Sequence, residues 1–371
     1  MITFTDVTKR YPDGTVAVDN LNIEVPQGTL AVFVGPSGCG KTTSMRMINR
    51  MIDPTSGTLT VNGEDVTKVD PVKLRLGIGY VIQSAGLMPH LRVVDNVATV
   101  PVLRGESRRS ARKAAMGVME RVGLDPSLAD RYPAQLSGGQ QQRVGVARAL
   151  AADPPILLMD EPFSAVDPVV REELQTEILR LQSELRKTIV FVTHDIDEAI
   201  KLGEKVAVFG SGGVLQQYDA PARLLSNPAN DLVAGFVGAD RGYRGLQFVH
   251  ATGLPLHEIR HVGEPEIDGL DLGPGEWVLV TKPDGTPYAW INAEGVEVHR
   301  RGGSLYDSSI AGGSLFRPEG TLRQALDAAL SAPSGLGVAV DEDTQLIGGV
   351  KASDVLAVLD EQRQIPEFGE A

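Results

Sequence analysis

The clearest chemical pattern in the sequence is a glycine-rich loop, GPSGCGKTT, at residues 35–43. It follows the apolar run LAVFV and precedes the helical segment TTSMRMINRMI. In this context backbone N–H groups and the Lys41 ammonium can hold the β and γ phosphates of a nucleotide, and Thr42 can ligate Mg²⁺. We interpret Cys39 as a small residue of the loop. The residues predicted to contact the nucleotide are Gly35, Ser37, Gly38, Cys39, Gly40, Lys41, Thr42 and Thr43.

Two adjacent carboxylates follow another apolar run, in the stretch ILLMDEP at residues 156–162. Asp160, at the expected strand end, can belong to the Mg²⁺ shell, and Glu161 can polarise a water in line with the γ-phosphate. Acidic residues after a buried strand are also common as loop caps. The phosphate-binding loop in the same chain favours the catalytic interpretation.

Three more side chains could contact a nucleotide. His194, in IVFVTHD, follows an apolar strand and could hydrogen-bond the γ-phosphate, although a histidine at a strand end is often structural. Gln83, in YVIQ, is a polar residue after an apolar segment. Tyr11, which we place before the first strand pair, could stack on adenine or could be an ordinary core or surface tyrosine.

A second glycine pair lies in LSGGQ at residues 136–140, where a helix is expected to begin. Backbone N–H groups at such a position favour an anion. The chain has two candidate anion sites but only one set of catalytic residues, Lys41 with the Asp160–Glu161 pair. One such set cannot serve two nucleotides. We therefore predict a two-fold homodimer in which this motif covers the nucleotide of the partner chain. The predicted contacts are Ser137, Gly138, Gly139 and Gln140.

The elements that must position these residues are short apolar strands separated by helices. The runs AVFVG, ILLM, IVFV and KVAVF fit strands buried on both faces of a parallel sheet. A helix is predicted over 169–187, with Asp167 as its N-cap and Pro168 at its first position. The first domain is therefore expected to be α/β. The apolar face of the helix consists of Val170, Leu174, Ile178, Leu181 and Leu185.

Taken in order, the phosphate loop and the words VIQ, LSGGQ, LLMDEP, SAVD and THD resemble the ATP-binding cassette of ABC transporters over about residues 1–236. The resemblance implies that the chain binds ATP and Mg²⁺ and hydrolyses ATP. It assigns adenine stacking to Tyr11, Mg²⁺ and water contacts to Gln83, and the general base to Glu161. It also assigns the γ-phosphate contact to His194 and a contact across the dimer to Asp167.

The words MINR, PTSG, DPVKLR and IGYVIQ resemble one branch of that family, the ATPases of osmoprotectant uptake systems. These import glycine betaine, choline, carnitine or proline. An importer of another small solute is an alternative, as is a soluble cassette ATPase that acts on nucleic acid or ribosomes. The loop after Gln83 is where such ATPases meet the membrane subunit, although His90 could equally be a solvated loop residue. The candidates for that contact are Leu87, Met88, Pro89 and His90.

Beyond a predicted linker at residues 237–246, the segment 247–371 contains two weakly similar pieces. EWVLVTKPDGTPYAWIN and LGVAVDEDTQLIGGVKASDVLAVL each indicate strand, turn and strand, with a following helix clear only in the second. A helix capped by Thr321 precedes the second piece. It is predicted to run through Leu322, Ala325, Leu326 and Leu330.

This tandem resembles a pair of CBS modules with a degenerate first copy. In nucleotide-binding modules an aspartate at the position of Asp354 contacts ribose, but Lys351 stands where a hydroxyl is usual. The resemblance implies a regulatory ligand, and a dimerisation platform is the alternative.

Composition supports two domains, since 371 residues exceed the usual size of one. The formal net charge of -13 argues against a nucleic-acid partner. Cys39 is the single cysteine, so an internal disulfide is excluded. The apolar runs are too short to cross a membrane. We expect a peripheral protein on the cytoplasmic face of the cell membrane, bound to permease subunits and, through them, to a substrate-binding protein.

Overall fold

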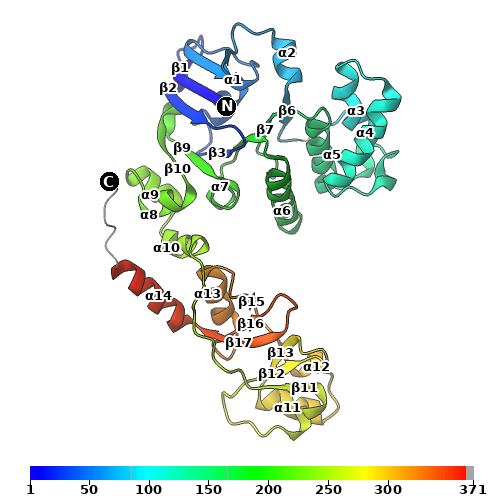
Figure 1. Ribbon diagram of the computed structural model, residues 1–371, viewed down its shortest axis with the longest axis vertical. Coiled ribbons are helices and arrows are strands. Elements are labelled where there is room, and N and C mark those ends of the chain that lie inside the picture. Colours follow the sequence, from blue (N-terminus) through cyan, green and yellow to red (C-terminus); the bar gives the residue numbers. More distant parts are fainter. Residues whose placement is uncertain (85, 165, 365–371) are drawn as a thin grey trace. The chain divides into compact units, whose positions relative to one another are not determined.

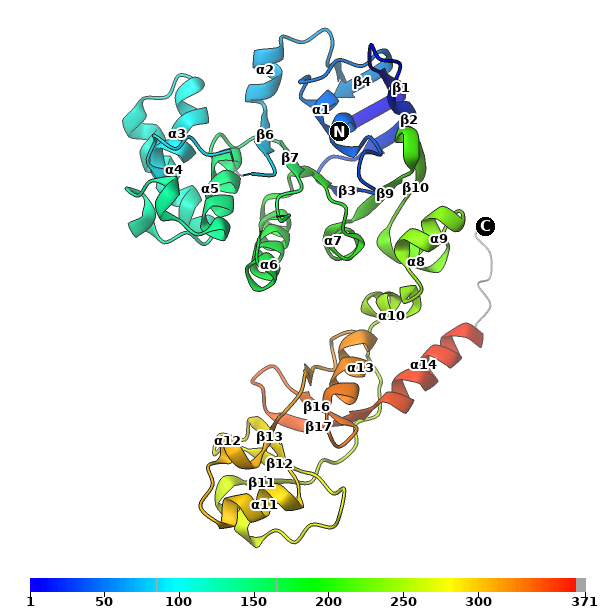
Figure 2. The ribbon, with the colours of Figure 1, turned by 180° about the vertical axis from the view of Figure 1, so that it is seen from behind.

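The computed structural model describes residues 1–84, 86–164 and 166–364, which Figures 1 and 2 show from opposite sides. The chain divides into two compact units, Met1–Ala239 and Asp240–Ala371. Each unit has hydrophobic clusters of its own. Ala165, in the SAVD motif, and the predicted end of the C-terminal domain at residue 371 lie outside the described residues.

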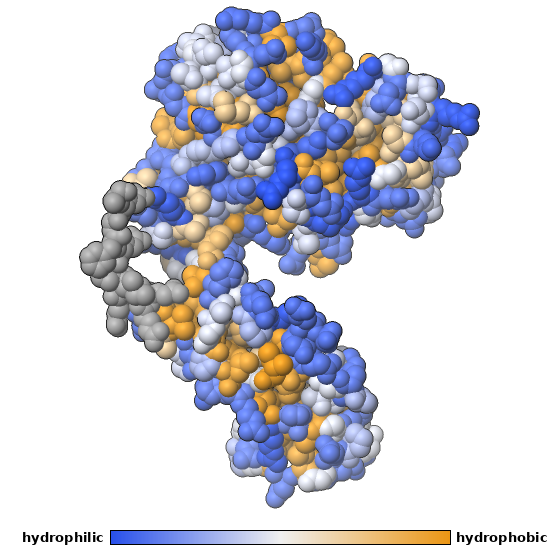
Figure 3. All heavy atoms as spheres, in the orientation of Figure 1, coloured by the Kyte–Doolittle hydropathy of each residue, from blue (hydrophilic) through white to orange (hydrophobic). Residues whose placement is uncertain are grey.

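In the part of the chain that the structure describes, no helix is long and apolar enough to span a membrane. On the face shown in Figure 3, hydrophobic residues form separate patches among hydrophilic ones. Such a mixture is usual, because apolar atoms contribute more than half of the surface of most folded proteins.

The centre of the first unit is a six-stranded sheet with the order β10-β9-β3-β8-β7-β6. β10 is antiparallel to β9, and the other neighbours are parallel. All residues of β3, β7 and β8 are buried, as expected for strands covered on both faces. The predicted α/β class is therefore confirmed for this unit. The strands are β3 (Leu30–Val34), β6 (Ile78–Val81), β7 (Ile156–Asp160), β8 (Thr188–Val192), β9 (Lys205–Phe209) and β10 (Leu215–Asp219).

Side chains of β3 alternate between two hydrophobic clusters, because neighbouring residues of a strand point to opposite faces of the sheet. Leu30, Val32 and Val34 belong to one cluster, together with residues of the helices that follow β7 and β8. Ala31 and Phe33 belong to the other, together with residues of a second, smaller sheet. The central sheet is therefore the middle layer of the unit.

The smaller sheet is antiparallel and has the order β2-β1-β4-β5. It packs through the second cluster, which also contains residues of α1. Its strands and the two helices near it in sequence are β1 (Ile2–Arg10), β2 (Val16–Val25), β4 (Ser56–Val61), β5 (Glu64–Asp65), α1 (Lys41–Ile48) and α2 (Pro71–Leu76).

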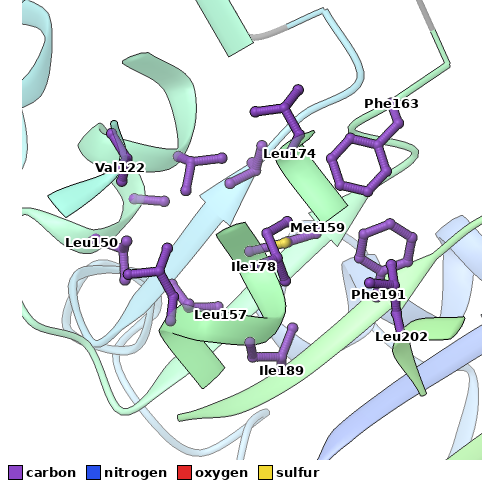
Figure 4. Close-up of a cluster of buried hydrophobic side chains, with 14 of the residues drawn as sticks. Val122, Leu150, Leu157, Met159, Phe163, Leu174, Ile178, Ile189, Phe191 and Leu202 are labelled. Carbon is purple, nitrogen blue, oxygen red and sulfur yellow. The ribbon is translucent and has the colours of Figure 1, made fainter. Parts of the chain in front are cut away.

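The helix predicted after the SAVD motif is α6 (Pro168–Leu185). Asp167 is its N-cap and accepts a hydrogen bond from the backbone N–H of Val169, so the predicted start is confirmed. Leu174, Ile178 and Leu181 are buried in the first cluster. Figure 4 shows Leu174 and Ile178 in this cluster, which also holds the tilted ring pair Phe163–Phe191.

Three helices of the first unit form a separate group, α3 (Val93–Leu103), α4 (Arg108–Arg121) and α5 (Gly138–Leu150). They pack against one another, and α5 also packs against β6 and α6. In both views α5 lies with α3 and α4, apart from α1 (Figures 1 and 2). The remaining elements are the 3₁₀ helices η1 (Pro126–Leu128), η2 (Pro133–Gln135) and η3 (Ser211–Gly213) and the helices α7 (Ile196–Leu202), α8 (Pro221–Ser226) and α9 (Asp231–Val237).

The second unit repeats one topology. In each copy a strand pairs in parallel with the next strand, which pairs antiparallel with a third, and a helix follows. The first copy consists of β11 (His261–Gly263), η5 (Glu264–Gly269), β12 (Val278–Thr281), β13 (Pro287–Ile291) and α11 (Ala293–Arg300). The second consists of β15 (Leu315–Phe316), α13 (Leu322–Ser331), β16 (Leu336–Val340), β17 (Leu346–Lys351) and α14 (Ala352–Gln364). The others are α10 (Arg241–Gly245), η4 (Leu246–Phe248), α12 (Leu305–Ser308) and β14 (Ile310–Ala311).

One expectation for this unit was wrong. A helix was expected to be clear only in the second copy, but α11 follows the first copy, with Asn292 as its N-cap. α13 runs through Leu322, Ala325, Leu326 and Leu330, as predicted, although Leu330 is 67% exposed. The buried face is rotated toward Ala328 and Ala329, because the helix packs against β16 through small side chains. Thr321 does cap α13, as predicted.

Candidate active site

The glycine-rich loop at residues 35–43 connects β3 to α1. Gly40, the N-cap of α1, has a φ of 92°, and a Cβ there would lie 2.1 Å from the carbonyl oxygen of Ala17. A Cβ on Gly35 would lie 2.3 Å from the carbonyl oxygen of Phe209. The path therefore requires glycine at both positions. Because Gly40 has no side chain to cap α1, the N–H groups of the first turn remain available to an anion.

Lys41 is the first residue of α1 and is only 5% exposed. Its Nζ donates to the carbonyl oxygens of Gly35 at 2.6 Å and Pro36 at 2.8 Å. Two carbonyl dipoles balance a buried ammonium only in part. A phosphate group against the loop supplies the opposite charge, so this lysine fits the predicted role.

The other predicted loop residues divide into two groups. Ser37 and Gly38 are exposed, and Thr43 is half-buried in the first turn of α1. Cys39 is buried and belongs to the hydrophobic cluster beneath the loop. The burial agrees with the interpretation of Cys39 as a small residue, so any contact it makes with phosphate is through its backbone.

Asp160 is the last residue of β7, and it is buried. The hydroxyl of Thr42 donates to its Oδ1 at 2.9 Å, so the two predicted metal ligands from distant parts of the sequence meet. Hydroxyl and carboxylate oxygens are ligands that Mg²⁺ prefers. The donor set therefore fits the predicted metal.

Two residues that the sequence analysis missed also hold Asp160. The Tyr80 hydroxyl, on β6, donates to Oδ2 at 3.4 Å, and Arg46, on α1, lies 3.6 Å from the same oxygen. Burial raises the pKa of Tyr80, and a hydrogen bond with Tyr80 holds the pKa of Arg46 above its usual value. The signal available in the sequence was spacing, since Arg46 follows Thr42 by one helical turn.

Glu161 and His194 lie beside this pair, after the neighbouring strands β7 and β8. Oε2 of Glu161 is 3.2 Å from Nδ1 of His194. Glu161 has a left-handed φ of 43°, and its N–H donates to the carbonyl oxygen of Val192 at 2.9 Å. That backbone conformation is unfavourable for a non-glycine residue and fixes the direction of the carboxylate. The two predicted catalytic side chains are thus brought together.

Gln83 and Tyr11 are not joined to the phosphate loop by hydrogen bonds among the described residues. Gln83 is exposed, in a turn after β6. Tyr11 was expected before the first strand pair, but it lies between β1 and β2. The positive φ of Asp6 and a register shift between Phe4 and Val7 interrupt the alternation by which residues 2–10 could be recognised as a strand. Nζ of Lys9 lies 5.3 Å from the centre of its half-buried ring. Adenine stacking by Tyr11 stays a prediction.

The second glycine pair begins α5. Ser137 and Gln140 form a capping box, in which the Ser137 hydroxyl accepts from the Gln140 N–H and the Gln140 side chain accepts from the Ser137 N–H. Gly138 is exposed, whereas Gly139 is buried, and a Cβ on Gly139 would lie 2.4 Å from Val170. One glycine of the pair therefore lies at the close packing of α5 against α6, where a larger residue would displace the Val170 side chain.

The loop predicted to meet the membrane subunit is shaped by Asn96, a buried residue of α3. Its side chain accepts from the Met88 N–H at 2.8 Å and donates to the Met88 carbonyl oxygen at 3.1 Å. Leu87 packs on the core, while Pro89 and His90 are exposed. Asn96 thus holds the backbone next to the exposed tip.

In the second unit, Asp354 already has partners. Its Oδ2 lies 2.8 Å from Nε2 of His257 and accepts from the Lys351 N–H at 3.2 Å. The backbones of His257 and Gly349 also exchange two hydrogen bonds of 2.7 Å each. Asp354 therefore helps to fasten the segment around His257 to β17.

The phosphate loop, the buried carboxylate facing it and the parallel sheet that carries both define a phosphate-loop ATPase. The ABC transporter family model matches residues 18–164. Several relatives match nearly the whole chain, among them carnitine and choline transport proteins. The carnitine transport ATP-binding protein OpuCA of Listeria monocytogenes is 50% identical over 97% of this chain and 92% of its own length. The choline transport ATP-binding protein OpuBA of Bacillus subtilis is 37% identical over 97% of this chain and 96% of its own length.

Among solved structures, the cassette MJ0796 as a post-hydrolysis dimer with ADP and Pi is 34% identical, with a TM-score of 0.55. The aligned region comprises 60% of this chain and 99% of the MJ0796 chain. The chain therefore belongs to the ATP-binding subunits of ABC transporters, which are ATP hydrolases.

Proposed function

We propose that the chain hydrolyses ATP to drive uptake of a quaternary-amine osmoprotectant, with glycine betaine, choline, carnitine and proline as the candidates. The observation that carries the proposal is the similarity to the carnitine and choline transport proteins, which extends over both units. An importer of another small solute is the alternative. A cassette ATPase that acts outside transport is disfavoured by the same relatives.

The site residues have distinct tasks in this proposal. The loop at residues 35–43 and Lys41 bind the phosphates of the substrate ATP, with the first-turn N–H groups of α1. Thr42 and Asp160, with Gln83, would hold Mg²⁺, which neutralises charge on the phosphates when bound. Glu161 takes the proton from the attacking water, and His194 hydrogen-bonds the γ-phosphate. The Glu161–His194 contact of 3.2 Å orients both side chains.

A second copy of the chain completes the site. Ser137, Gly138, Gly139 and Gln140 lie on α5, which packs with α3 and α4 rather than beside α1. A two-fold dimer would place this motif over the γ-phosphate held by the partner, with Asp167 at the contact between chains. The dimeric state of the related cassette supports the arrangement.

The remaining partners are permease subunits and, through them, a substrate-binding protein. The exposed tip formed by Pro89 and His90 is the proposed contact with the permease. This interaction would keep the chain peripheral, on the cytoplasmic face of the membrane. Movement of α3 would then follow the loop, because Asn96 joins them.

The second unit is proposed to be a tandem of CBS-like modules that regulates transport. The repeated strand–strand–strand–helix topology supports this proposal. The engagement of Asp354 by His257 argues against a ribose contact in the second module. The first copy is less regular, since a 3₁₀ helix stands where the second copy has α13. A platform that only dimerises the chain remains the alternative.

Uptake into vesicles tests the proposal. The full chain and its co-purified permease and binding protein would be reconstituted with ATP inside the vesicle and labelled glycine betaine, choline, carnitine or proline outside. We expect ATP-dependent accumulation of at least one of these solutes, absent with Glu161→Gln. Hydrolysis without accumulation of any of the four, but with uptake of another solute, would contradict the osmoprotectant assignment.

A further inference from the structure

Glu198 is a buried acid that the proposed hydrolysis does not use. It lies in the first turn of α7 and is 7% exposed. A carboxylate is rarely buried to this extent unless other groups hold it. Burial raises the pKa of Glu198, against the opposing effect of a hydrogen bond from Thr193.

One oxygen of Glu198 holds the turn that carries His194. The Thr193 hydroxyl donates to Oε2 of Glu198 at 2.7 Å and accepts from the Asp195 N–H at 3.0 Å. In an ordinary capping box the acid at this position would accept directly from the N-cap N–H. Here the Thr193 hydroxyl lies between the Glu198 carboxylate and the Asp195 N–H. Thr193 and Asp195, the two sequence neighbours of His194, are therefore both linked to Glu198.

The other oxygen of Glu198 faces α6. Nε2 of Gln175 lies 3.5 Å from Oε1, and Nε of Arg171 lies 4.0 Å from it. Arg171 also donates through Nη2 to the carbonyl oxygen of Val166 at 3.3 Å. Val166 immediately precedes Asp167, so the contacts lead from the His194 turn to the segment proposed to face the partner chain.

A cavity of about 50 Å³ lies between the Arg171–Glu198 pair and the Glu161–His194 pair. A volume of this size has room for roughly one or two water molecules, which could bridge the 4.0 Å between Arg171 and Glu198. The cavity is lined by Glu161, Ser164, Arg171, Thr193, His194, Asp195 and Glu198.

We propose that Glu198 is a positioning residue that holds His194 against Glu161 through Thr193 and ties this turn to α6 through Arg171 and Gln175. The inference rests on the proposed function, which assigns the γ-phosphate contact to His194 and the dimer contact to Asp167. In the dimer, a displacement of the segment at Asp167 would reach His194 through Arg171 and Glu198. Closure of two chains would thus be coupled to the contact with the γ-phosphate.

Steady-state ATP hydrolysis by the full chain tests the link to Thr193. Thr193→Val removes the donor to Glu198 at nearly constant volume, and we expect kcat to fall on the order of tenfold with KM for ATP within about twofold, since the phosphate loop is untouched. Thr193→Ser keeps the donor and is expected to restore kcat. A kcat for Thr193→Val within twofold of wild type, while His194→Ala is more than tenfold lower, would overturn the proposal.

The link to α6 has a matched control. Arg171→Met is expected to lower kcat severalfold by uncoupling Glu198 from the Val166 segment. Glu172→Gln breaks an exposed ion pair of 3.7 Å with Lys201, which also joins α6 to α7, and should leave kcat unchanged. Equal losses in the two variants would show a general need for α6–α7 contacts and would overturn the specific role of Glu198.

NMR of the histidine side chains distinguishes a failure of the positioning role of Glu198 from a failure of the role assigned to His194 in hydrolysis. The chain has six histidines, and His194→Ala assigns the signal of His194. Thr193→Val should shift that signal and leave those of histidines in the second unit in place, while Thr193→Ser should not. If His194→Ala hydrolyses ATP normally, the assigned role of His194 fails, yet a shifted signal still supports positioning. An unshifted signal in Thr193→Val overturns it.

Discussion

Two helices of the first unit have glycine at their N-terminus, as the N-cap of α1 and as the first residue of α5, and the two N-termini are built differently. α1 starts after Gly40, which offers no side chain to its first turn, and Lys41 is buried directly behind it. α5 starts after Ser137, which forms a reciprocal capping box with Gln140. The first N-terminus is open to an anion and has a cation beside it, whereas the second already has its own cap. The comparison agrees with the proposed function, in which α1 binds phosphate in a single chain and α5 contacts a phosphate presented by a second chain.

The largest difference should appear in the chemistry beside α1. Glu161→Gln removes the proposed base at constant shape, and we expect hydrolysis to drop on the order of 10²- to 10⁴-fold. ATP binding should persist, because Lys41 and the loop remain. Phosphate release and binding of a fluorescent ATP analogue measure the two properties. Turnover near wild type would remove Glu161 from this role.

The second difference concerns affinity. Lys41→Ala deletes the buried cation behind α1, and a charge-assisted hydrogen bond of about 1.5–3 kcal/mol corresponds to roughly a 10- to 100-fold weaker ATP affinity. Gln140→Ala alters the N-terminus of α5 and should leave the affinity of a single chain unchanged. Titration calorimetry at low protein concentration compares them. Equal losses in affinity would show that both helices contact nucleotide within one chain.

The glycines provide a third contrast. Gly40→Ala places a Cβ 2.1 Å from a backbone oxygen in a left-handed conformation, and we expect a loss of stability of at least about 1–3 kcal/mol. Gly139→Ala meets the side chain of Val170 at 2.4 Å, which can move, and alanine favours the helix by about 1 kcal/mol. Denaturant unfolding should show the smaller loss for Gly139→Ala. The reverse order would contradict the packing argument.

The smallest effect is expected at the cap of α5. Ser137→Ala removes the hydroxyl that accepts from Gln140, which should cost about 1 kcal/mol of unfolding free energy. Ser137→Asn, another good cap, should retain most of it. Thermal unfolding of the two variants provides the measurement, and a wild-type stability of Ser137→Ala would show that the capping box contributes nothing.

The sequence predicted best those features that depend on neighbouring residues. Asp167 and Pro168 mark the start of α6 because N-caps and first-turn prolines act locally. The loop at residues 35–43 was recognised for the same reason, since its strand, glycines and helix are contiguous. The meeting of Thr42 and Asp160 agrees with the prediction that both residues ligate the same Mg²⁺.

Features that depend on distant packing were not predicted. Tyr80 and Arg46 act on Asp160 only because β6 and α1 flank β7. Tyr80 belongs to the word IGYVIQ, but nothing in that word pointed to a contact with Asp160. Leu330 fits the helical period of α13 but faces outward, because small alanines contact β16. The contact of Asp354 with His257 could not be predicted from the sequence either, since the two residues are nearly a hundred positions apart.

The most direct test of the central claim measures whether α5 completes a site in another chain. In the Glu161→Gln background, light scattering with ATP should show an increase in mass from that of the ATP-free chain. Adding Ser137→Arg should abolish this ATP-dependent increase, because the bulky cation fills the space for the partner's γ-phosphate, while binding of ATP to each chain persists. Ser183→Arg, at an exposed position of α6, is the control and should dimerise normally. An undiminished ATP-dependent increase with Ser137→Arg would contradict the account.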